Sequence, residues 1–381
     1  MKTLTWQKPG QQNVAQELIK IIINYVAELR NNVTLQPDKV EDLKEKYMKN
    51  KNILTILFLM LVLTVISCGN SNKKSDRIDA VEKEVVKAPE FNADSAYAYV
   101  GAQADFGPRV PNTKAHEECG EYLAQQLEKF GAKVYNQRAD LIAWDGTILK
   151  ARNIIGAYKP ESKKRIMLCA HWDSRPYADN DPDPKNHHTH ILGVNDGASG
   201  VGVLLEIARQ IQQKEPALGI DIIFFDAEDY GTPEFYTGQP KQDTWCLGSQ
   251  FWARTPHVQN YNARYGILLD MVGGKDATFY YEGYSSETAR SEMKKIWKKA
   301  HELGYGKYFV KADGIPVTDD HLYVHQLARI PCVDIINYDA NNERSSFGST
   351  WHTINDTMDN IDRNTLKAVG QTVMDVIYNE K

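Results

Sequence analysis

The chain has few cysteines, no basic cluster and no long apolar segment, and each absence removes a class of protein. Its 381 residues include five cysteines, a weak basis for a disulfide framework. The formal net charge is −5, without a cluster of lysine and arginine, so we expect no nucleic-acid partner. Buried thiols rather than bridges are expected at Cys119, Cys169, Cys246 and Cys332.

The longest apolar run, residues 53–66, is too short for a membrane span, which needs about 20 apolar residues. It follows a basic start at Met48 and ends just before Cys68, as in a secretory signal. The sequence before Cys68 resembles a bacterial lipoprotein box, which implies a signal peptide at residues 48–68 and a lipidated Cys68. We therefore expect a lipid-anchored protein of the bacterial cell envelope that meets the membrane through Cys68. A buried core helix, the alternative, is disfavoured by the polar residues on both sides.

Three further segments complete the organisation. Residues 1–47 lie upstream of a complete signal, and we interpret them as a spurious or unrelated extension. Residues 69–89 are mostly polar at their start and predict a flexible tether. Because 42% of the chain is hydrophobic, residues 90–381 can form one large core. They are the expected catalytic domain.

Strand and helix patterns alternate through residues 90–381, which predicts an α/β fold of three layers, α/β/α, around a mostly parallel, mixed sheet. The expected helices cover residues 114–130, 287–303, 319–327 and 364–378, and another begins at Ala198. The expected strands cover residues 133–142, 149–157, 166–171, 222–225, 267–270 and 331–337.

Acidic side chains follow the apolar run at residues 222–225 almost directly. Glu228 lies two residues after Asp226, and Asp229 follows Glu228 directly. The carboxyl ends of strands in an open α/β sheet face the ligand crevice, so Glu228 and Asp229 would reach one site while pointing in different directions. One could bind a metal while the other moves protons. A solvated loop after a core strand is the plainer interpretation, and other segments weigh against it.

Further strand ends and turns carry side chains that bind metals. His171 and Asp270 each end an expected strand, and His352 lies in a polar loop before the final helix. Asp196 lies in a turn of small residues before the helix at Ala198, where it either caps that helix or ligates a cation. Nitrogen and oxygen ligands from several elements suit a zinc site with one open position.

The order of these residues resembles the ligand series of the zinc aminopeptidase superfamily, over about residues 90–381. The similarity implies a zinc aminopeptidase-like α/β/α sandwich. Within that superfamily the chain is more similar to the glutaminyl cyclases of the bacterial type, because Trp351 precedes His352 and residues 318–321 read Thr-Asp-Asp-His. It differs from the animal cyclases at two positions. Asp229 replaces a glutamate ligand, and Asp334 replaces a histidine.

The resemblance implies a glutaminyl-peptide cyclotransferase, which converts the N-terminal glutamine of peptides and proteins to pyroglutamate and releases ammonia. The implied ligands of its single zinc are Asp196, Asp229 and His352. Glu228 would take a proton from the α-amine and pass it to the departing ammonia, which needs a pKa raised toward neutrality. The implied supporting carboxylates are Asp270 and Asp319, and the implied substrate contacts are Trp351 and Asp334.

Two other functions remain open. A two-zinc aminopeptidase would hold a second zinc with His171 and Asp270, bridged through Asp196, and Glu228 would activate a bridging water. A secreted binding lipoprotein with a vestigial site is disfavoured, because no carboxylate is missing. The histidine-rich residues 186–190 are interpreted as an exposed loop, with a second ion site or a rim of the pocket as the alternatives.

Overall fold

The structure is a computed structural model that describes residues 86–239 and 241–380. The predicted extension at residues 1–47, the predicted signal at residues 48–68 and most of the predicted tether lie outside the described residues. Cys68 and its expected lipidation lie outside them as well. In the part that the structure describes, no helix has the length and apolarity needed to cross a membrane.

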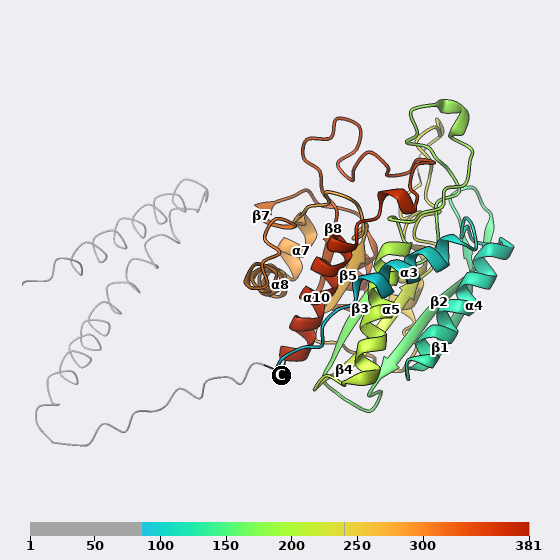
Figure 1. Cartoon of the computed structure of the whole chain (residues 1–381). Coiled ribbons are helices and arrows are strands. Elements are labelled where there is room, and N and C mark those ends of the chain that lie inside the picture. The colour runs from blue at the N-terminus through green and yellow to red at the C-terminus, as the bar shows by residue number, and fades with distance from the viewer. Residues whose placement is uncertain (1–85, 240, 381) are drawn as a thin grey trace, which may run out of the picture. The chain divides into compact units, whose positions relative to one another are not determined.

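A six-stranded sheet forms the middle layer of the domain (Figure 1). Its order is β1 (Lys133–Ile142), β2 (Ile148–Tyr158), β4 (Gly219–Phe225), β3 (Arg165–His171), β5 (Gly266–Asp270) and β8 (Cys332–Ile336). Strands β4, β3, β5 and β8 run parallel, whereas β1 pairs with β2, and β2 with β4, in antiparallel register. The parallel strands are buried along their whole length, as expected of strands covered on both faces. The predicted mixed sheet is confirmed.

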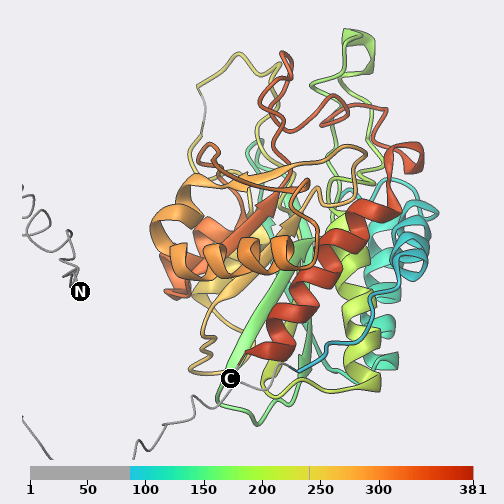
Figure 2. The ribbon, with the colours of Figure 1, turned by 60° about the vertical axis from the view of Figure 1, so that its left-hand side comes forward.

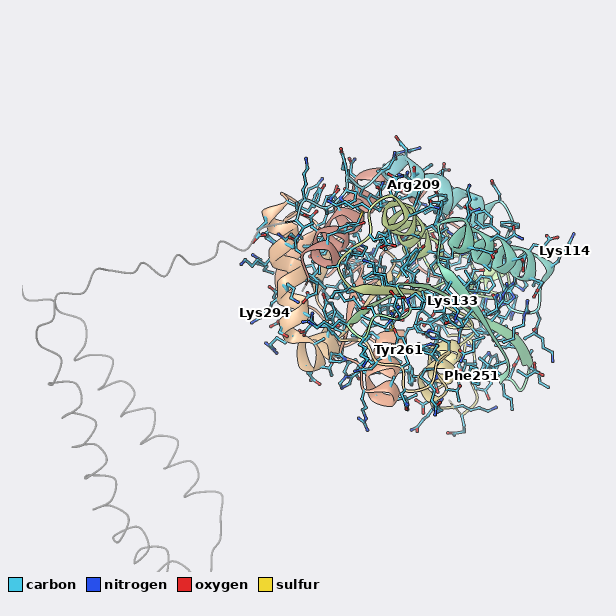
Figure 3. All side chains as sticks on the ribbon, turned by 90° about the horizontal axis from the view of Figure 1, so that it is seen from below. Lys114, Lys133, Arg209, Phe251, Tyr261 and Lys294 are labelled. Atoms are coloured by element: carbon cyan, nitrogen blue, oxygen red, sulfur yellow. The ribbon has the colours of Figure 1, made fainter. Side chains whose placement is uncertain are left out.

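Helices cover both faces of this sheet. One face shares a hydrophobic core with α3 (Ala93–Ala104), α4 (Lys114–Lys129), α5 (Ala198–Gln213), α8 (Arg290–Glu302) and α10 (Arg363–Asn379). The other face packs against α6 (Leu247–Arg254) and α9 (Asp320–Ala328). Helices α5 and α10 lie side by side (Figure 2). Seen from below, Arg209 on α5 and Phe251 on α6 mark the two outer layers, with Lys133 of β1 between them (Figure 3). This is the predicted three-layer sandwich.

Most predicted elements match the structure within a few residues. The helix expected at residues 287–303 corresponds to α8, and a short helix that was not predicted, α7 (Gly283–Thr288), precedes it; Ala289 separates the two because it leaves the helical conformation at φ −138° and ψ 31°. The two helices on either side of Ala289 make different contacts. Ser285 of α7 accepts a hydrogen bond from the Asp334 amide, while Trp297 of α8 lies in the core.

Short elements complete the domain. The chain also forms a small sheet of β6 (Phe279–Tyr281) and β7 (Phe309–Asp313) and two 3₁₀ turns, η1 (Pro184–Asn186) and η2 (Met358–Asn360).

The first described residues pack against the last helix. The Val86 amide donates to Oδ1 of Asn379, and the Asn379 side chain donates back to the Val86 carbonyl oxygen. Ala88 is buried in the core. The end of the predicted tether, residues 86–89, therefore belongs to the folded domain. Glu380 accepts a hydrogen bond from Tyr265 just before β5, so this contact lies at the amino ends of the parallel strands.

Candidate active site

The loops that follow the parallel strands meet at one end of the domain, beyond the carboxyl ends of those strands (Figure 1). His171 and Asp270 are the last residues of β3 and β5, and Glu228 follows β4 closely. Sharp turns redirect the chain there, since Ala227, Met271 and His352 adopt positive φ angles of 53°, 49° and 52°. Such angles are uncommon for residues other than glycine and often occur at functional sites.

Asp196, Asp229 and His352, the Asp196 group, converge at this end. Nε2 of His352 lies 3.2 Å from Oδ1 of Asp229 and 3.6 Å from Oδ2 of Asp196. All three residues are buried, and their candidate ligand atoms lie within 4.8 Å of one another. Among the described residues, Oδ2 of Asp196 and Oδ2 of Asp229 have no hydrogen-bond partner. Buried carboxylate oxygens need a partner, so this set of one nitrogen and two carboxylates fits a zinc ion.

A layer of polar side chains holds the Asp196 group in place. Oδ1 of Asp179 lies 3.4 Å from Nδ1 of His352, and Arg175 donates two hydrogen bonds to the Asp179 carboxylate. The carboxylate of Asp356 accepts from the backbone amides of residues 195 and 196, which fixes the turn before α5. Such outer contacts orient metal ligands and strengthen binding.

A second group, His171, Asp196 and Asp270, shares Asp196 with the first and is called the His171 group. Nε2 of His171 lies 3.0 Å from Oδ1 of Asp196 and 3.2 Å from Oδ1 of Asp270. Burial opposes charge on His171, yet its hydrogen bonds with Asp173, Asp196 and Asp270 together raise the pKa of the imidazole well above its ordinary value. Burial raises the pKa of Asp270 to about 7. Nε2 of His171 thus has both carboxylates as partners.

Glu228 lies beside the two groups. It is 9% exposed, and its Oε1 lies 3.2 Å from Sγ of Cys246. Burial raises the pKa of Glu228 well above its ordinary value, and the negative charges of Asp229 and Asp319 add to that effect. The backbone amides of residues 228 and 229 both donate to the Asp173 carboxylate, which fixes the direction of each side chain. A carboxyl group whose pKa is raised in this way is suited to bind and release a proton during a reaction.

A cavity of about 270 Å³ opens above these groups, and we call it the catalytic cavity. Its polar floor is formed by Asp196, Glu228, Asp229, Asp270, Asp319 and His352. Its walls are Trp245, Met271, Pro316, Val317, Thr318, Ile336, Phe347 and Trp351. The Trp351 ring stacks on the His352 ring with centroids 3.7 Å apart, and the Trp245 ring lies parallel to His352 at 6.0 Å. Aromatic walls around a few polar groups are typical of small-molecule sites.

The predicted substrate contact at Asp334 is wrong. Asp334 is fully buried and does not line the catalytic cavity; its Oδ2 lies 3.6 Å from Nδ1 of His321. Ile336, two residues nearer the carboxyl end of β8, forms that part of the wall instead. Side chains two apart in a strand share a face, so Asp334 points the same way but lies deeper. Burial raises the pKa of Asp334 well above its ordinary value.

Several residues of the site are not among those predicted from the sequence. Trp245, Ile336 and Phe347 come from three separate segments, without a local pattern that predicts a shared wall. Arg175 and Asp179 carry one signal, because their spacing of four suits an ion pair, and they do form one. The four cysteines among the described residues, Cys119, Cys169, Cys246 and Cys332, are buried and free of disulfides, as predicted.

The histidine-rich loop does not contribute to this site. Nε2 of His187 contacts the Asp181 carbonyl oxygen, and the His188 ring packs on Phe235 with centroids 4.5 Å apart. Within the described ranges these histidines belong neither to a cluster of metal-type ligands nor to the lining of the catalytic cavity. The interpretation as a loop with exposed residues holds for His188 and His190.

Comparison with known proteins agrees with the fold. The model of peptidase family M28 matches residues 153–377. The glutaminyl cyclase of Bacteroides thetaiotaomicron is 67% identical, with a TM-score of 0.76 over 77% of this chain and 100% of that one. A leucine aminopeptidase precursor from Bacteroides thetaiotaomicron VPI-5482 is also 67% identical, with a TM-score of 0.76 over 78% of this chain and 100% of that one. The glutaminyl-peptide cyclotransferase of Bos taurus is 23% identical over 368 residues, which are 84% of this chain and 94% of the bovine protein.

The sandwich and its strand-end ligands thus define an enzyme of the zinc exopeptidase-like class. The range that the family model matches, residues 153–377, contains every residue of the Asp196 group and of the His171 group. The chain belongs to peptidase family M28 and, within it, groups with the bacterial glutaminyl cyclases. One equally similar structure bears the name of an aminopeptidase.

Proposed function

We propose that this chain is a glutaminyl-peptide cyclotransferase that converts N-terminal glutamine to pyroglutamate with release of ammonia. The observation that carries the proposal is the pairing of Glu228 with the Asp196 group on one floor, under walls that include Trp245 and Trp351. A single glutaminyl residue can place its α-amine at Glu228 and its γ-amide at the Asp196 group. Holding both reacting groups of one residue in place supplies much of the acceleration that a ring closure needs.

The chain's own residues would divide the work as follows. Asp196, Asp229 and His352 would hold one zinc, which would polarise the γ-amide carbonyl. Glu228 Oε would accept a proton from the α-amine nitrogen as that nitrogen attacks the amide carbon, and would return it to the departing ammonia. Its raised pKa suits both directions of transfer. Asp270 and Asp319 line the same floor and would bind the amine hydrogens.

One zinc rather than two is favoured by the hydrogen bonding of the two groups. In the Asp196 group, two buried carboxylate oxygens lack a hydrogen-bond partner among the described residues. In the His171 group, Nε2 of the imidazole already has one oxygen of Asp196 and one of Asp270 as partners, at 3.0 and 3.2 Å. The second ligand set is therefore better explained as an internal hydrogen-bonded group.

The two-zinc aminopeptidase is the second candidate, and one observation favours it. The ligand atoms of the His171 group also lie within 4.8 Å of one another and share Asp196 with the first group, as a bridged pair of metals would require. The deciding measurement compares ammonia released from a Gln-initiated peptide with leucine released from a Leu-initiated one, with zinc stoichiometry on the same sample. A cyclase gives ammonia at one zinc per chain. Leucine release at two zincs without ammonia would favour the aminopeptidase.

We also infer an envelope location, on the sequence pattern alone. The basic start at Met48, the apolar run and Cys68 support a lipoprotein signal at residues 48–68. The mature chain would then begin at a lipidated Cys68, without residues 1–47, and would attach to a membrane through that residue. Mass spectrometry of the native N-terminus tests this. A mature chain that still carries residues 1–47 would exclude it.

A further inference from the structure

A second cavity adjoins the catalytic cavity and shares part of its wall. It measures about 470 Å³ and shares Trp245 and Thr318 with the catalytic cavity. Its other walls include Asp243, Leu322, Tyr323 and Gln326. We call it the outer cavity. It is formed by the loop that precedes α6 and by one side of α9.

The shared wall lies next to Glu228. Candidate ligand atoms of Glu228, Cys246 and Asp319 lie within 4.8 Å of one another. Cys246 directly follows Trp245, and Asp319 directly follows Thr318. Trp245 and Thr318 are therefore the sequence neighbours of Cys246 and Asp319, the two groups beside Glu228, and the Trp245 ring also lies 6.0 Å from the His352 ring. The shared wall borders the part of the catalytic cavity that contains Glu228.

The chemistry of a glutaminyl substrate fixes where the rest of its peptide must leave. The α-amine and the carbonyl that continues the peptide are bonded to the same carbon, whereas the γ-amide lies at the end of the side chain. With the amine at Glu228, the peptide leaves the catalytic cavity beside Glu228. At Val317, Ile336 and Phe347 the catalytic cavity adjoins another space of only about 10 Å³, roughly enough for one water molecule.

We propose that the outer cavity binds the residues that follow the N-terminal glutamine, so that the preferred substrates are peptides rather than free glutamine or its amide. The inference rests on the proposed cyclotransferase function. It assigns the contacts beyond the first residue to Trp245, Thr318, Leu322, Tyr323 and Gln326, because these side chains face the continuing chain in the outer cavity.

Asp243 gives the outer cavity a charge preference. Its carboxylate is exposed and accepts a hydrogen bond of 3.0 Å from the Tyr323 hydroxyl, and among the described residues it forms no ion pair. The one cation on the same wall, Lys241, donates its Nζ to the Trp144 carbonyl oxygen. A lysine or arginine side chain in the peptide can therefore pair with Asp243. An exposed pair of this kind corresponds to a preference of up to about fivefold over an acidic residue.

The test measures kcat/KM for ammonia release from glutaminamide, Gln-Ala-NH₂, Gln-Ala-Lys-NH₂ and Gln-Ala-Glu-NH₂. With the wild-type enzyme we expect kcat/KM to rise with length, through KM, and to favour the lysine peptide. Gln326→Trp would fill the outer cavity and lower the ratio of kcat/KM for a tripeptide to kcat/KM for glutaminamide severalfold. Gln125→Trp places the same bulk on the exposed face of α4 as the matched control, and its ratio should equal that of the wild type.

Asp243→Asn isolates the charge, because asparagine tolerates the positive φ of 53° at this position. This variant should bind both tripeptides equally. The inference would be overturned if the wild-type ratio of kcat/KM for a tripeptide to kcat/KM for glutaminamide were near one, or if Gln326→Trp left that ratio unchanged. In either case, ammonia release from glutaminamide would leave the proposed function intact. Absence of ammonia from every substrate would instead overturn the proposed function, and this inference with it.

Discussion

Asp179 lies behind His352, with its Oδ1 3.4 Å from Nδ1 of the ring, and the same carboxylate receives two hydrogen bonds from the fully buried Arg175. The arrangement turns Nε2 of His352 toward Asp229 and Asp196. The Asn180 amide also donates to the His352 carbonyl oxygen, which helps to hold the left-handed backbone at His352. A carboxylate behind a ligand histidine sets both its tautomer and its orientation.

Asp179→Asn should weaken zinc binding by about 10- to 100-fold, because outer-shell partners of metal-binding histidines have effects of that size. The measurement is chelator competition at a temperature where circular dichroism shows the variant folded, since Arg175 loses its partner. Asp183→Asn, an exposed change in the same loop, is the control and should retain wild-type affinity. Equal affinity in the wild type and Asp179→Asn would mean that Asp179 does not orient His352.

Glu228→Gln should retain zinc and lose at least about 10²-fold in kcat, since the amide cannot accept the amine proton. His352→Ala and Asp229→Asn should both lose zinc, because each removes a member of the Asp196 group. Metal content by atomic absorption, measured beside steady-state ammonia release, separates these effects. The opposite pattern, with zinc lost from Glu228→Gln and retained in Asp229→Asn, would reverse the roles of the two neighbouring side chains.

Glu282 should make the stability of the domain depend on acid pH. It accepts hydrogen bonds from the amides of Tyr284, Ser285 and Val317 and contacts Nε2 of His321 at 3.0 Å. Burial alone would raise its pKa, yet the contact with His321 and the amide hydrogen bonds lower the pKa of Glu282 from 4.5 to about 2. A carboxyl group whose pKa is lower in the folded protein than in the unfolded chain stabilises the fold at pH values above its unfolded pKa. This stabilisation is lost as the pH falls through its folded pKa.

The free energy of unfolding should therefore fall between about pH 4.5 and pH 2. Glu282→Gln should lower it at pH 7 by about 3 kcal/mol, the linkage value of this shift, and should flatten the acid dependence. Urea unfolding at pH 7 and pH 3.5 measures both quantities. The control is Glu287→Gln, an exposed change in the same helix as Ser285. Equal losses in the two variants would show that Glu282 contributes no more to stability than the exposed Glu287.

Two glycines in helices should respond to alanine with opposite signs. A Cβ at Gly200 of α5 would lie 2.1 Å from the Leu269 carbonyl oxygen and 2.9 Å from Cβ of Ala170, whereas at Gly101 of α3 its nearest neighbour is Cε of Met358 at 3.5 Å. Gly200→Ala should destabilise the domain by about 1–3 kcal/mol, since α5 must move off the sheet. Gly101→Ala should stabilise it by up to about 1 kcal/mol through helix propensity. Thermal unfolding of both variants checks the pair, and a stabilised Gly200→Ala would contradict the tight contact.

Strand-end chemistry could be predicted from the sequence because it depends on local pattern. His171, Glu228 and Asp270 each follow an apolar run, and parallel strands bring such ends together. The depth of a side chain along its strand depends instead on the length of neighbouring loops. Asp334 and Ile336 share a face of β8, and only the fold shows that Ile336 reaches the cavity.

The sequence is less informative where local signals are weak. Helix α6 is not among the predicted elements, and it begins after Cys246, which has a φ of 56° and provides no side-chain cap. Ala289 interrupts the helix predicted at residues 287–303 although alanine is a strong helix former. In both places contacts distant in sequence override local preference: the Cys246 amide bonds to the Glu228 carbonyl oxygen, and Ser285 bonds to the Asp334 amide.

The mutual hydrogen bonds of Val86 and Asn379 also fix where the chain enters the described domain. They lie at the amino ends of the parallel strands, whereas the catalytic cavity lies at the carboxyl ends. A tether that joins the domain at Val86 would thus enter it at the end opposite to the cavity. It would leave the mouth of the cavity clear for incoming peptides.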